Sequence, residues 1–455
     1  MGRVILSATG SGSGKTIITC GIMQALKNKG LNVKSYKCGP DYIDPMFHQN
    51  VLDIPSDNLD SFFSTKEHLI ELLSLGEDFD ISVIEGVMGI YDGLGGVTDT
   101  GSAYDLARIT DTPIVLIVNA NGVGRTIIPI VKGIIAEDTD NRIKGIILNR
   151  ISESFYNTIS PIMEEEIGVP VIGYLPTIKN ICLESRHLGL KLPSEINDLK
   201  NQVDVIANLV KDKIDLERLM DIAGEAFSWG QTPYGGQTPG RGLSPEKPHV
   251  RLAVAKDEVF CFYYEENFRI LKRMGVNIEF FSPIHDEKMP EAVDGLLLGG
   301  GYPELRLEEL SNNKSMRDSI KKAIDNGMPS MAECGGFMYL HNAIINDDGM
   351  KYEMVGVIDG ECHNTQKLCR FGYVDLNIDK YKVKGHEFHY FDSSANGNEC
   401  KATKPVTGKS WNYGYYDEKK IWGFPHLYYP SAPEFVTNFI ASMRNYRIGR
   451  EDFNG

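Results

Sequence analysis

A cysteine followed by two glycines, in the segment PSMAECGGFMYL, is the residue of this sequence best suited to covalent chemistry. Cys334 follows a short apolar segment, and a helical pattern that includes Phe337 and Leu340 begins after the glycines. This order is typical of a nucleophile elbow, in which a tight turn between a strand and a helix presents a reactive side chain. We expect the positive end of the helix to lower the pKa of the thiol and to favour the thiolate. The alternative is a packed structural cysteine.

A nucleophilic cysteine needs a base and donors that stabilise the developing oxyanion. His426, in the segment WGFPHLYYPSAPE, follows an expected short strand and lies far enough downstream to approach Cys334 in space. The backbone amides of Gly335 and of Gly300, within the run Gly299–Gly301, are the candidate oxyanion donors. A lone histidine is more often structural, but this combination favours acyl transfer.

A phosphate-binding loop is predicted near residue 10, where the apolar segment RVILSA is followed by TGSGSGKT and a helical pattern. Gly12 and Gly14 allow backbone amides to wrap a phosphate, Lys15 supplies positive charge, and the hydroxyl of Thr16 is suited to a magnesium ion. Thr9 stands where this motif usually has its first glycine, so the loop is a variant. A flexible Gly/Ser turn does not account for Gly-Lys-Thr at the start of a helix, and we expect nucleotide binding.

Acidic residues follow two of the expected strands. Asp41 and Asp44 lie in the loop segment PDYIDPMFH, Glu85 lies just past the end of the strand in DISVIEGVMGIYDG, and Asp92 follows on the next loop. Open parallel sheets bind ligands at the carboxyl ends of their strands, so these carboxylates are expected near the phosphates together with Thr16. Their oxygen atoms suit magnesium. The alternative is that they are solvated loop acids.

Alternating apolar strands and helical patterns predict two doubly wound α/β domains. In the first, Asn149 ends the buried segment IKGIILNR, where its amide is placed to recognise an adenine edge. Residues 228–248 are rich in Gly, Pro, Gln and Thr, which is typical of a linker. We therefore expect a nucleotide-binding domain at 1–227, a second domain with Cys334 at a strand end at 249–445, and a C-terminal tail at 446–455.

Composition restricts the partners of the chain. With 455 residues and a formal net charge of −15, the sequence is not expected to bind nucleic acid, although an anionic substrate remains compatible with local amides and a few cations. Its 8 cysteines form no CxxC pair, no signal peptide is apparent and no apolar run approaches the length of a bilayer. We expect a cytoplasmic protein without membrane partners; the sequence leaves its oligomeric state open.

Six segments together resemble the cobyrinate a,c-diamide synthase family over residues 3–440: KCGPDYIDPMFH, EGVMGIYDG, SRHLGL, LLLGGGYPEL, AECGGFMYL and GHEFHY. The resemblance implies an N-terminal domain similar to dethiobiotin synthetase that activates tetrapyrrole carboxylates with ATP, and a C-terminal class I type glutaminase that releases ammonia from glutamine. It implies that Cys334 is the nucleophile and His426 its base. The remaining implied roles are ATP binding by Lys15 and Thr16, magnesium binding by Thr16, Asp44 and Glu85, and contact with the substrate or acyl phosphate by Asp41, Tyr42, Asp44 and Asp92.

One position departs from the family pattern. Members usually read His-x-His after the final strand, whereas this chain has Tyr428 two residues beyond His426, and a tyrosine hydroxyl is one candidate to orient the histidine. Three alternatives remain open: amidation of another tetrapyrrole, such as nickel-sirohydrochlorin or hydrogenobyrinate, a nucleotide switch of the partitioning ATPase kind, and a non-catalytic interaction protein. The switch proteins carry an extra lysine early in the loop, where this chain has Gly10.

Overall fold

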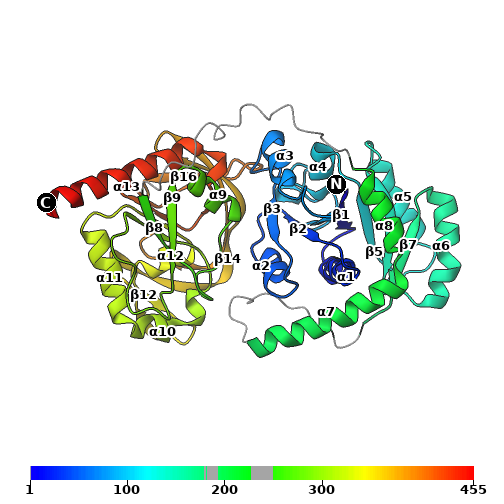
Figure 1. The fold of residues 1–455 in the computed structure, drawn as a ribbon, viewed down its shortest axis with the longest axis horizontal. Helices are drawn as coiled ribbons and strands as arrows, with labels where there is room; N and C mark the ends of the chain where they lie inside the picture. Colours follow the sequence, from blue (N-terminus) through cyan, green and yellow to red (C-terminus); the bar gives the residue numbers. More distant parts are fainter. Residues whose placement is uncertain (1, 179–180, 182–192, 227–249, 455) are drawn as a thin grey trace. The chain divides into compact units, whose positions relative to one another are not determined.

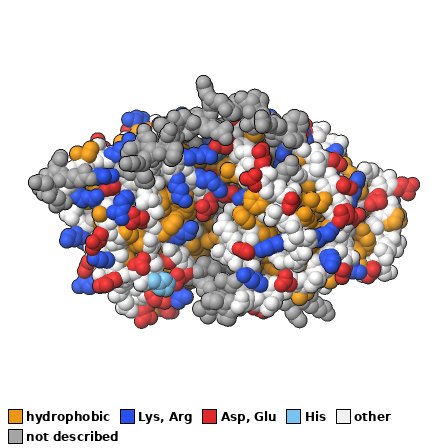
Figure 2. Space-filling view, in the orientation of Figure 1, with side chains coloured by type: hydrophobic (Ala, Val, Ile, Leu, Met, Phe, Trp, Pro, Cys, Tyr) orange, Lys and Arg blue, Asp and Glu red, His pale blue; other side chains and the backbone are white. Residues whose placement is uncertain are grey.

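The computed structural model describes residues 2–178, 181, 193–226 and 250–454 (Figure 1). The chain divides into two compact units, Met1–Gly230 and Gln231–Gly455, and each is described by itself. The expected linker at 228–248 and the SRHLGL motif, with its neighbour Glu184, lie outside the described residues. Acidic and basic side chains are interspersed on the face that Figure 2 shows.

A seven-stranded sheet in the order β3-β2-β4-β1-β5-β6-β7 forms the centre of unit 1. Every neighbouring pair of its strands is parallel, so their carboxyl ends meet at one edge. The strands are β1 (Gly2–Ala8), β2 (Val33–Cys38), β3 (Ser56–Leu59), β4 (Ile81–Glu85), β5 (Ile114–Asn119), β6 (Ile143–Asn149) and β7 (Val171–Leu175).

Helices cover both faces of this sheet, and two hydrophobic clusters fill the spaces between them (Figure 1). The helices are α1 (Lys15–Asn28), α2 (Ile43–Asn50), α3 (Lys66–Ser74), α4 (Ala103–Thr110), α5 (Ile127–Glu137), α6 (Glu153–Ile167), α7 (Pro193–Lys213) and α8 (Leu216–Gly224). Helix α1 packs closely on α7 because a Cβ on Gly21 would lie 2.5 Å from Cγ2 of Ile206. This packing fixes the helix that begins at Lys15.

A first sheet in unit 2 has the order β18-β19-β11-β10-β8-β9, and all its pairs except β18–β19 are parallel. Its strands are β8 (Val250–Ala255), β9 (Val276–Phe281), β10 (Gly295–Leu298), β11 (Ser330–Glu333), β18 (Tyr415–Tyr416) and β19 (Lys420–Gly423). The helices of this unit are α9 (Glu265–Arg273), α10 (Leu307–Asn312), α11 (Lys314–Asp325), α12 (Gly335–Tyr339) and α13 (Pro433–Asn454). Helix α13 runs without interruption past residue 446, where we expected the domain to end.

A second, seven-stranded sheet in unit 2 is absent from the sequence-based prediction. It joins β12 (His341–Ile345), β13 (Lys351–Glu353), β14 (Ile358–Ile378), β15 (Tyr381–Ser393), β16 (Cys400–Thr403), β17 (Ser410–Tyr413) and β20 (His426–Tyr428). Most of its pairs are antiparallel, and β20 lies at one edge beside β15. The alternation of buried and exposed residues along β15 is that of a strand packed on one face only.

No helix among the described residues has both the length and the apolar composition needed to cross a membrane.

A pair of glycine substitutions tests the packing behind α12. A Cβ on Gly336 would lie 2.1 Å from the carbonyl oxygen of Leu298, so Gly336→Ala should lower the free energy of unfolding by about 1–3 kcal/mol. Gly449, in α13, has no atom within 4 Å of such a Cβ, so Gly449→Ala should be neutral or stabilising by roughly 0.5–1 kcal/mol. Urea unfolding followed by tryptophan fluorescence measures both; equal effects of the two substitutions would contradict this packing.

Candidate active sites

The loop between β1 and α1 has the backbone that a phosphate site requires. Gly12 and Gly14 have φ angles of 76° and 85°, which a residue with a side chain rarely adopts, and α1 begins at the next residue, Lys15. The unpaired amides at the start of this fourteen-residue helix therefore follow the glycine loop, as expected for an anion site.

Asn149, expected to recognise adenine, also supports this loop. Its Nδ2 donates to the carbonyl oxygen of Ser13 at 2.8 Å, and its Oδ1 accepts from the backbone amide of Arg150 at 3.0 Å. A Cβ on Gly14 would lie 2.2 Å from the same Nδ2. Asn149 therefore holds the loop with one bond from each polar atom, and its second N–H and second oxygen lone pair stay compatible with the predicted contact to adenine.

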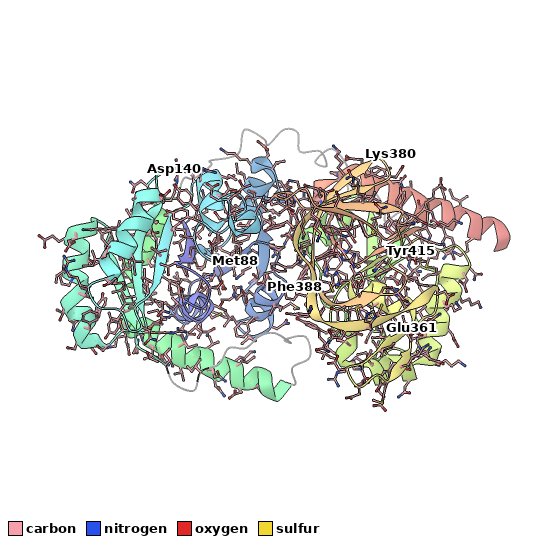
Figure 3. The ribbon with its side chains drawn as sticks, turned by 180° about the vertical axis from the view of Figure 1, so that it is seen from behind. Met88, Asp140, Glu361, Lys380, Phe388 and Tyr415 are labelled. Atoms are coloured by element: carbon pink, nitrogen blue, oxygen red, sulfur yellow. The ribbon has the colours of Figure 1, made fainter. Side chains whose placement is uncertain are left out.

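Lys15 and Thr16 point to different partners. Lys15 Nζ donates to the carbonyl oxygen of Met88 at 3.0 Å, and Met88 is labelled in Figure 3. Burial, and then the nearby charge of Lys37, lower the pKa of Lys15. Thr16 Oγ1 donates to Oε1 of Glu85 at 2.6 Å, so these two side chains are in contact at the sheet edge.

A buried lysine that the sequence-based prediction missed lies between the two central carboxylates. Lys37 Nζ donates to Asp44 Oδ2 and, at 3.1 Å, to Glu85 Oε1. Burial raises the pKa of Asp44 to about 6, whereas Lys37 and His48 hold the pKa of the buried Glu85 well below its usual range. His48 Nε2 lies 3.3 Å from Glu85 Oε2. The signal in the sequence for this cluster was Lys37 itself, a lysine near the end of strand β2, all of whose residues are buried.

The other predicted acids have structural partners. Asp41 Oδ1 accepts from the backbone amides of Ile43 at 2.8 Å and Asp44 at 3.2 Å, so it holds the first turn of helix α2. Tyr42 is buried in the same turn. Asp92 Oδ2 accepts from the amide of Gly89 at 2.8 Å, which shapes the loop after β4. Asp41 thus follows β2 and Asp92 lies on the loop after β4, at the carboxyl ends of neighbouring strands.

The side-chain oxygens of Thr16, Asp44 and Glu85 are the candidate ligands for a magnesium ion. Among the described residues, no group of three or more Asp, Glu, His or Cys side chains is arranged to hold a metal ion. A magnesium ion that is bound mainly by nucleotide phosphates needs only one or two protein oxygens, and Thr16 and Glu85 fit that requirement. Asp44 and Glu85 each already accept a hydrogen bond from the ammonium group of Lys37, so both carboxylates are partly neutralised before a cation binds.

Cys334 occupies the sharp turn predicted from its glycines. Its φ of 47° and ψ of −107° lie outside the common regions for a residue with a side chain, and it joins β11 directly to α12. The backbone amide of Cys334 donates to the carbonyl oxygen of Gly423, and that of Gly336 donates to the carbonyl oxygen of Gly299. These bonds hold the turn between β19 and β10.

The expectation of a lowered thiol pKa is wrong for this structure. Burial, followed by the nearby Glu304, raises the pKa of Cys334 well above its usual range, with smaller contributions from Glu387 and Glu333. A hydrogen bond from the amide of Gly335 opposes this shift. Helix α12 has only five residues, too short for its dipole to offset burial. Cys334 is therefore a thiol at rest and depends on a base.

His426 and the glycine run meet beside this turn. A Cβ on Gly300 would lie 2.2 Å from Cε1 of His426, and one on Gly335 would lie 3.1 Å from the amide nitrogen of Gly301. Gly300 therefore lies against the ring of His426, and Gly335 lies against the glycine run at Gly301. Burial lowers the pKa of His426 well below its usual range, so the imidazole is neutral and able to accept a proton.

Two further groups near Cys334 were not predicted. Glu387 is fully buried and accepts from His389 Nε2 at 3.0 Å. The His389 ring stacks on Phe424, with centroids 4.0 Å apart, and Phe424 follows the residue that bonds the Cys334 amide. Glu387 and His389 both belong to the GHEFHY motif. Only the pairing of β15 with β20 shows which residues of this motif lie near Cys334.

Comparison with known proteins identifies the two domains that carry these candidate sites. The chain matches the family model of the CobQ/CobB/MinD/ParA nucleotide binding domain at residues 4–190 and that of the CobB/CobQ-like glutamine amidotransferase domain at residues 251–424. It is 36% identical to cobyrinate a,c-diamide synthase of Priestia megaterium, with 99% of each chain covered. The enzyme of the same name from Thermoplasma volcanium is 37% identical, also over 99% of each chain.

The chain belongs to the cobyrinate a,c-diamide synthase family. This confirms the resemblance, the two α/β domains and the expected class of enzyme, a glutamine-hydrolysing ligase. The nucleotide-binding domain supports ATP as a substrate.

The carboxyl group beside the nucleophile gives a pH test of unit 2. Burial raises the pKa of Glu333 to about 8 from an ordinary 4.5, although the Tyr429 hydroxyl donates to its Oε1 at 3.0 Å. The folded state therefore favours the protonated acid, and the stability that this contributes is present below pH 4.5 and is lost as the pH rises to about 8.

Glu333→Gln should remove that slope, whatever its effect on stability at a single pH. Urea unfolding of both proteins between pH 5 and about 8.5, followed by the fluorescence of Trp411 and Trp422 in this unit, measures the slopes. Parallel curves for the wild type and the variant would show that Glu333 is already ionised in the folded protein.

Proposed function

We propose that this chain converts the a and c carboxylates of cobyrinate into amides, using ATP and ammonia released from glutamine, as a step in cobalamin biosynthesis. The observation that supports the proposal most is the presence, in one chain, of a strained cysteine turn beside a neutral buried histidine and of a phosphate loop beside a buried lysine–carboxylate cluster.

In the glutaminase half, His426 takes the proton of the Cys334 thiol and the sulfur attacks the amide carbon of glutamine. The amides of Gly335 and Gly300 donate to the oxygen that becomes negative. Collapse of this intermediate expels ammonia, which receives the proton from His426, and leaves a thioester on Cys334. Water activated by the same histidine then releases glutamate.

In the synthetase half, a substrate carboxylate attacks the γ-phosphate of ATP, giving an acyl phosphate and ADP. Lys15 exchanges its bond to a neutral carbonyl for a phosphate oxygen, and Lys37 neutralises charge near the reacting carboxylate. Ammonia then attacks the acyl phosphate, and phosphate and a proton leave. A magnesium ion held by Thr16 and Glu85 with the phosphates would offset their negative charge.

The proposal also names the tetrapyrrole that is amidated, cobyrinate. Nickel-sirohydrochlorin and hydrogenobyrinate are the alternative substrates, since the same chemistry serves each. Mass spectrometry of products formed from these acids with ATP and glutamine distinguishes them. We expect two successive mass decreases of about 1 Da from cobyrinate, the shift for replacing OH by NH2; no product from any acid would refute the proposal.

Replacing the nucleophile separates the two half-reactions. Cys334→Ser should abolish amidation with glutamine and retain amidation with ammonium salts, because the phosphate loop does not depend on the thiol. Product formation with each nitrogen source, followed by mass spectrometry, provides the measurement. Retained glutamate release, or loss of both activities in a folded variant, would exclude Cys334 as the nucleophile.

Replacing the loop lysine should affect both nitrogen sources equally. Lys15→Ala removes a positive charge from the transferring phosphoryl group and should lower the amidation rate by about two orders of magnitude or more. Glutamate release from glutamine alone is the internal control and should persist. Amidation rates near those of the wild type would rule out the role of Lys15 in phosphoryl transfer.

A further inference from the structure

The imidazole of His426 is enclosed by groups on two sides. On one side, a Cβ on Gly300 would lie 2.2 Å from Cε1, so the ring lies directly against the backbone there. Another imidazole, that of His386, is stacked against the ring, with centroids 5.0 Å apart and planes inclined by 21°. Both histidines are buried. The ring therefore has little freedom to turn.

The backbone brings these two rings together. His386 in β15 lies directly opposite His426 in β20, in an antiparallel pair. The preceding residue, Gly385, allows the short strand β20 to approach, because a Cβ there would lie 2.4 Å from the carbonyl oxygen of His426. The stacked pair is thus set by the strand register and by a close backbone approach.

His386 is itself anchored by a tyrosine. The hydroxyl of the buried Tyr264 lies 3.1 Å from Nδ1 of His386, a hydrogen-bond distance. The ring of Tyr264 also packs edge-on against Tyr428, with centroids 5.6 Å apart. Tyr428, expected as the candidate orienter of His426, therefore belongs to the same row of rings, through Tyr264 and His386.

We propose that His386 is a positioning residue of the glutaminase site: its flat ring, anchored by Tyr264, holds the imidazole of His426 in the orientation in which it accepts the proton of Cys334. This inference rests on the proposed glutaminase activity. It assigns to a stacked ring the orienting role that a carboxylate or a second imidazole has in the His-x-His pattern, from which this chain departs at Tyr428.

The charge state of His386 suits this role. Burial lowers the pKa of His386 to about 3, so its ring is uncharged at neutral pH. When His426 takes up the proton of Cys334, the neighbouring ring adds no second positive charge to the buried site, where like charges repel strongly. A lysine or arginine at this position would oppose that proton transfer.

Three substitutions test the inference through glutamate release from glutamine. His386→Leu retains an apolar side chain without a flat ring and should lower kcat about tenfold or more, with KM for glutamine nearly unchanged, since orientation affects the reaction rather than binding. His386→Phe restores a flat ring and should return kcat to within about threefold of the wild type. Tyr264→Phe removes only the anchoring hydroxyl and should lower kcat by a smaller factor.

Amidation with ammonium salts is the control and should be unchanged in all three variants. Equal kcat values for wild type and His386→Leu, or a change in KM alone, would overturn the inference. So would a His386→Phe variant that is folded by tryptophan fluorescence yet as slow as His386→Leu. If His386→Leu does not fold, an unchanged kcat in Tyr264→Phe would still overturn it. Failure of the wild type to release glutamate would refute the glutaminase proposal instead.

Discussion

Cys334 has a φ of 47°, which a residue with a Cβ adopts only where the surrounding structure imposes it. Here the surroundings are backbone: the carbonyl group of Gly423 in β19 accepts the hydrogen bond from the Cys334 amide, and that of Gly299, directly after β10, accepts from the Gly336 amide. No side chain fits at Gly336, because a Cβ would meet the carbonyl group of Leu298. Cys334 is therefore placed by the two strands that flank β11 in the sheet, and the positions of Gly335 and Gly300, the proposed oxyanion donors, follow from the same strands.

The phosphate-loop unit depends on a balance of buried charges. Two lysines, Lys15 and Lys37, lie near two carboxylates, Asp44 and Glu85. Lys37 bonds both carboxylates, and breaking a buried ion pair costs about 3–5 kcal/mol. Among the described residues, Lys15 donates only to the carbonyl oxygen of Met88, and a hydrogen bond of a charged group to a neutral one contributes about 1.5–3 kcal/mol. In the proposed phosphate site, an arriving phosphate would therefore recruit Lys15 at lower cost than Lys37, which would continue to hold the carboxylates in place.

Sequence-based prediction succeeded for features that are set by residues close together in the chain. The glycines around Lys15, the turn at Cys334 and the acids after β2 and β4 are local patterns, and within unit 1 the parallel strand order alone brings the glycine loop and the acids to one sheet edge. It missed Lys37, Glu387 and His386 because their roles depend on partners in other strands. The pairing of β15 with β20 cannot be inferred from a strand of three residues. The thiol pKa was misjudged for a related reason, since burial among three carboxylates outweighs a short helix.

The two units use burial in opposite ways. Around Cys334 and His426, burial keeps both groups uncharged at rest, so the proposed proton transfer would create a thiolate and an imidazolium in a medium of low dielectric constant. Such a pair needs support for each partner: the Gly335 amide would bond the thiolate, and the stacked His386, being neutral, would add no repulsion beside the imidazolium. Around Lys37, by contrast, the charges are permanent and already compensated. A site that must create charge needs rigid dipoles, whereas a site that receives a charged substrate needs one cation that is weakly held.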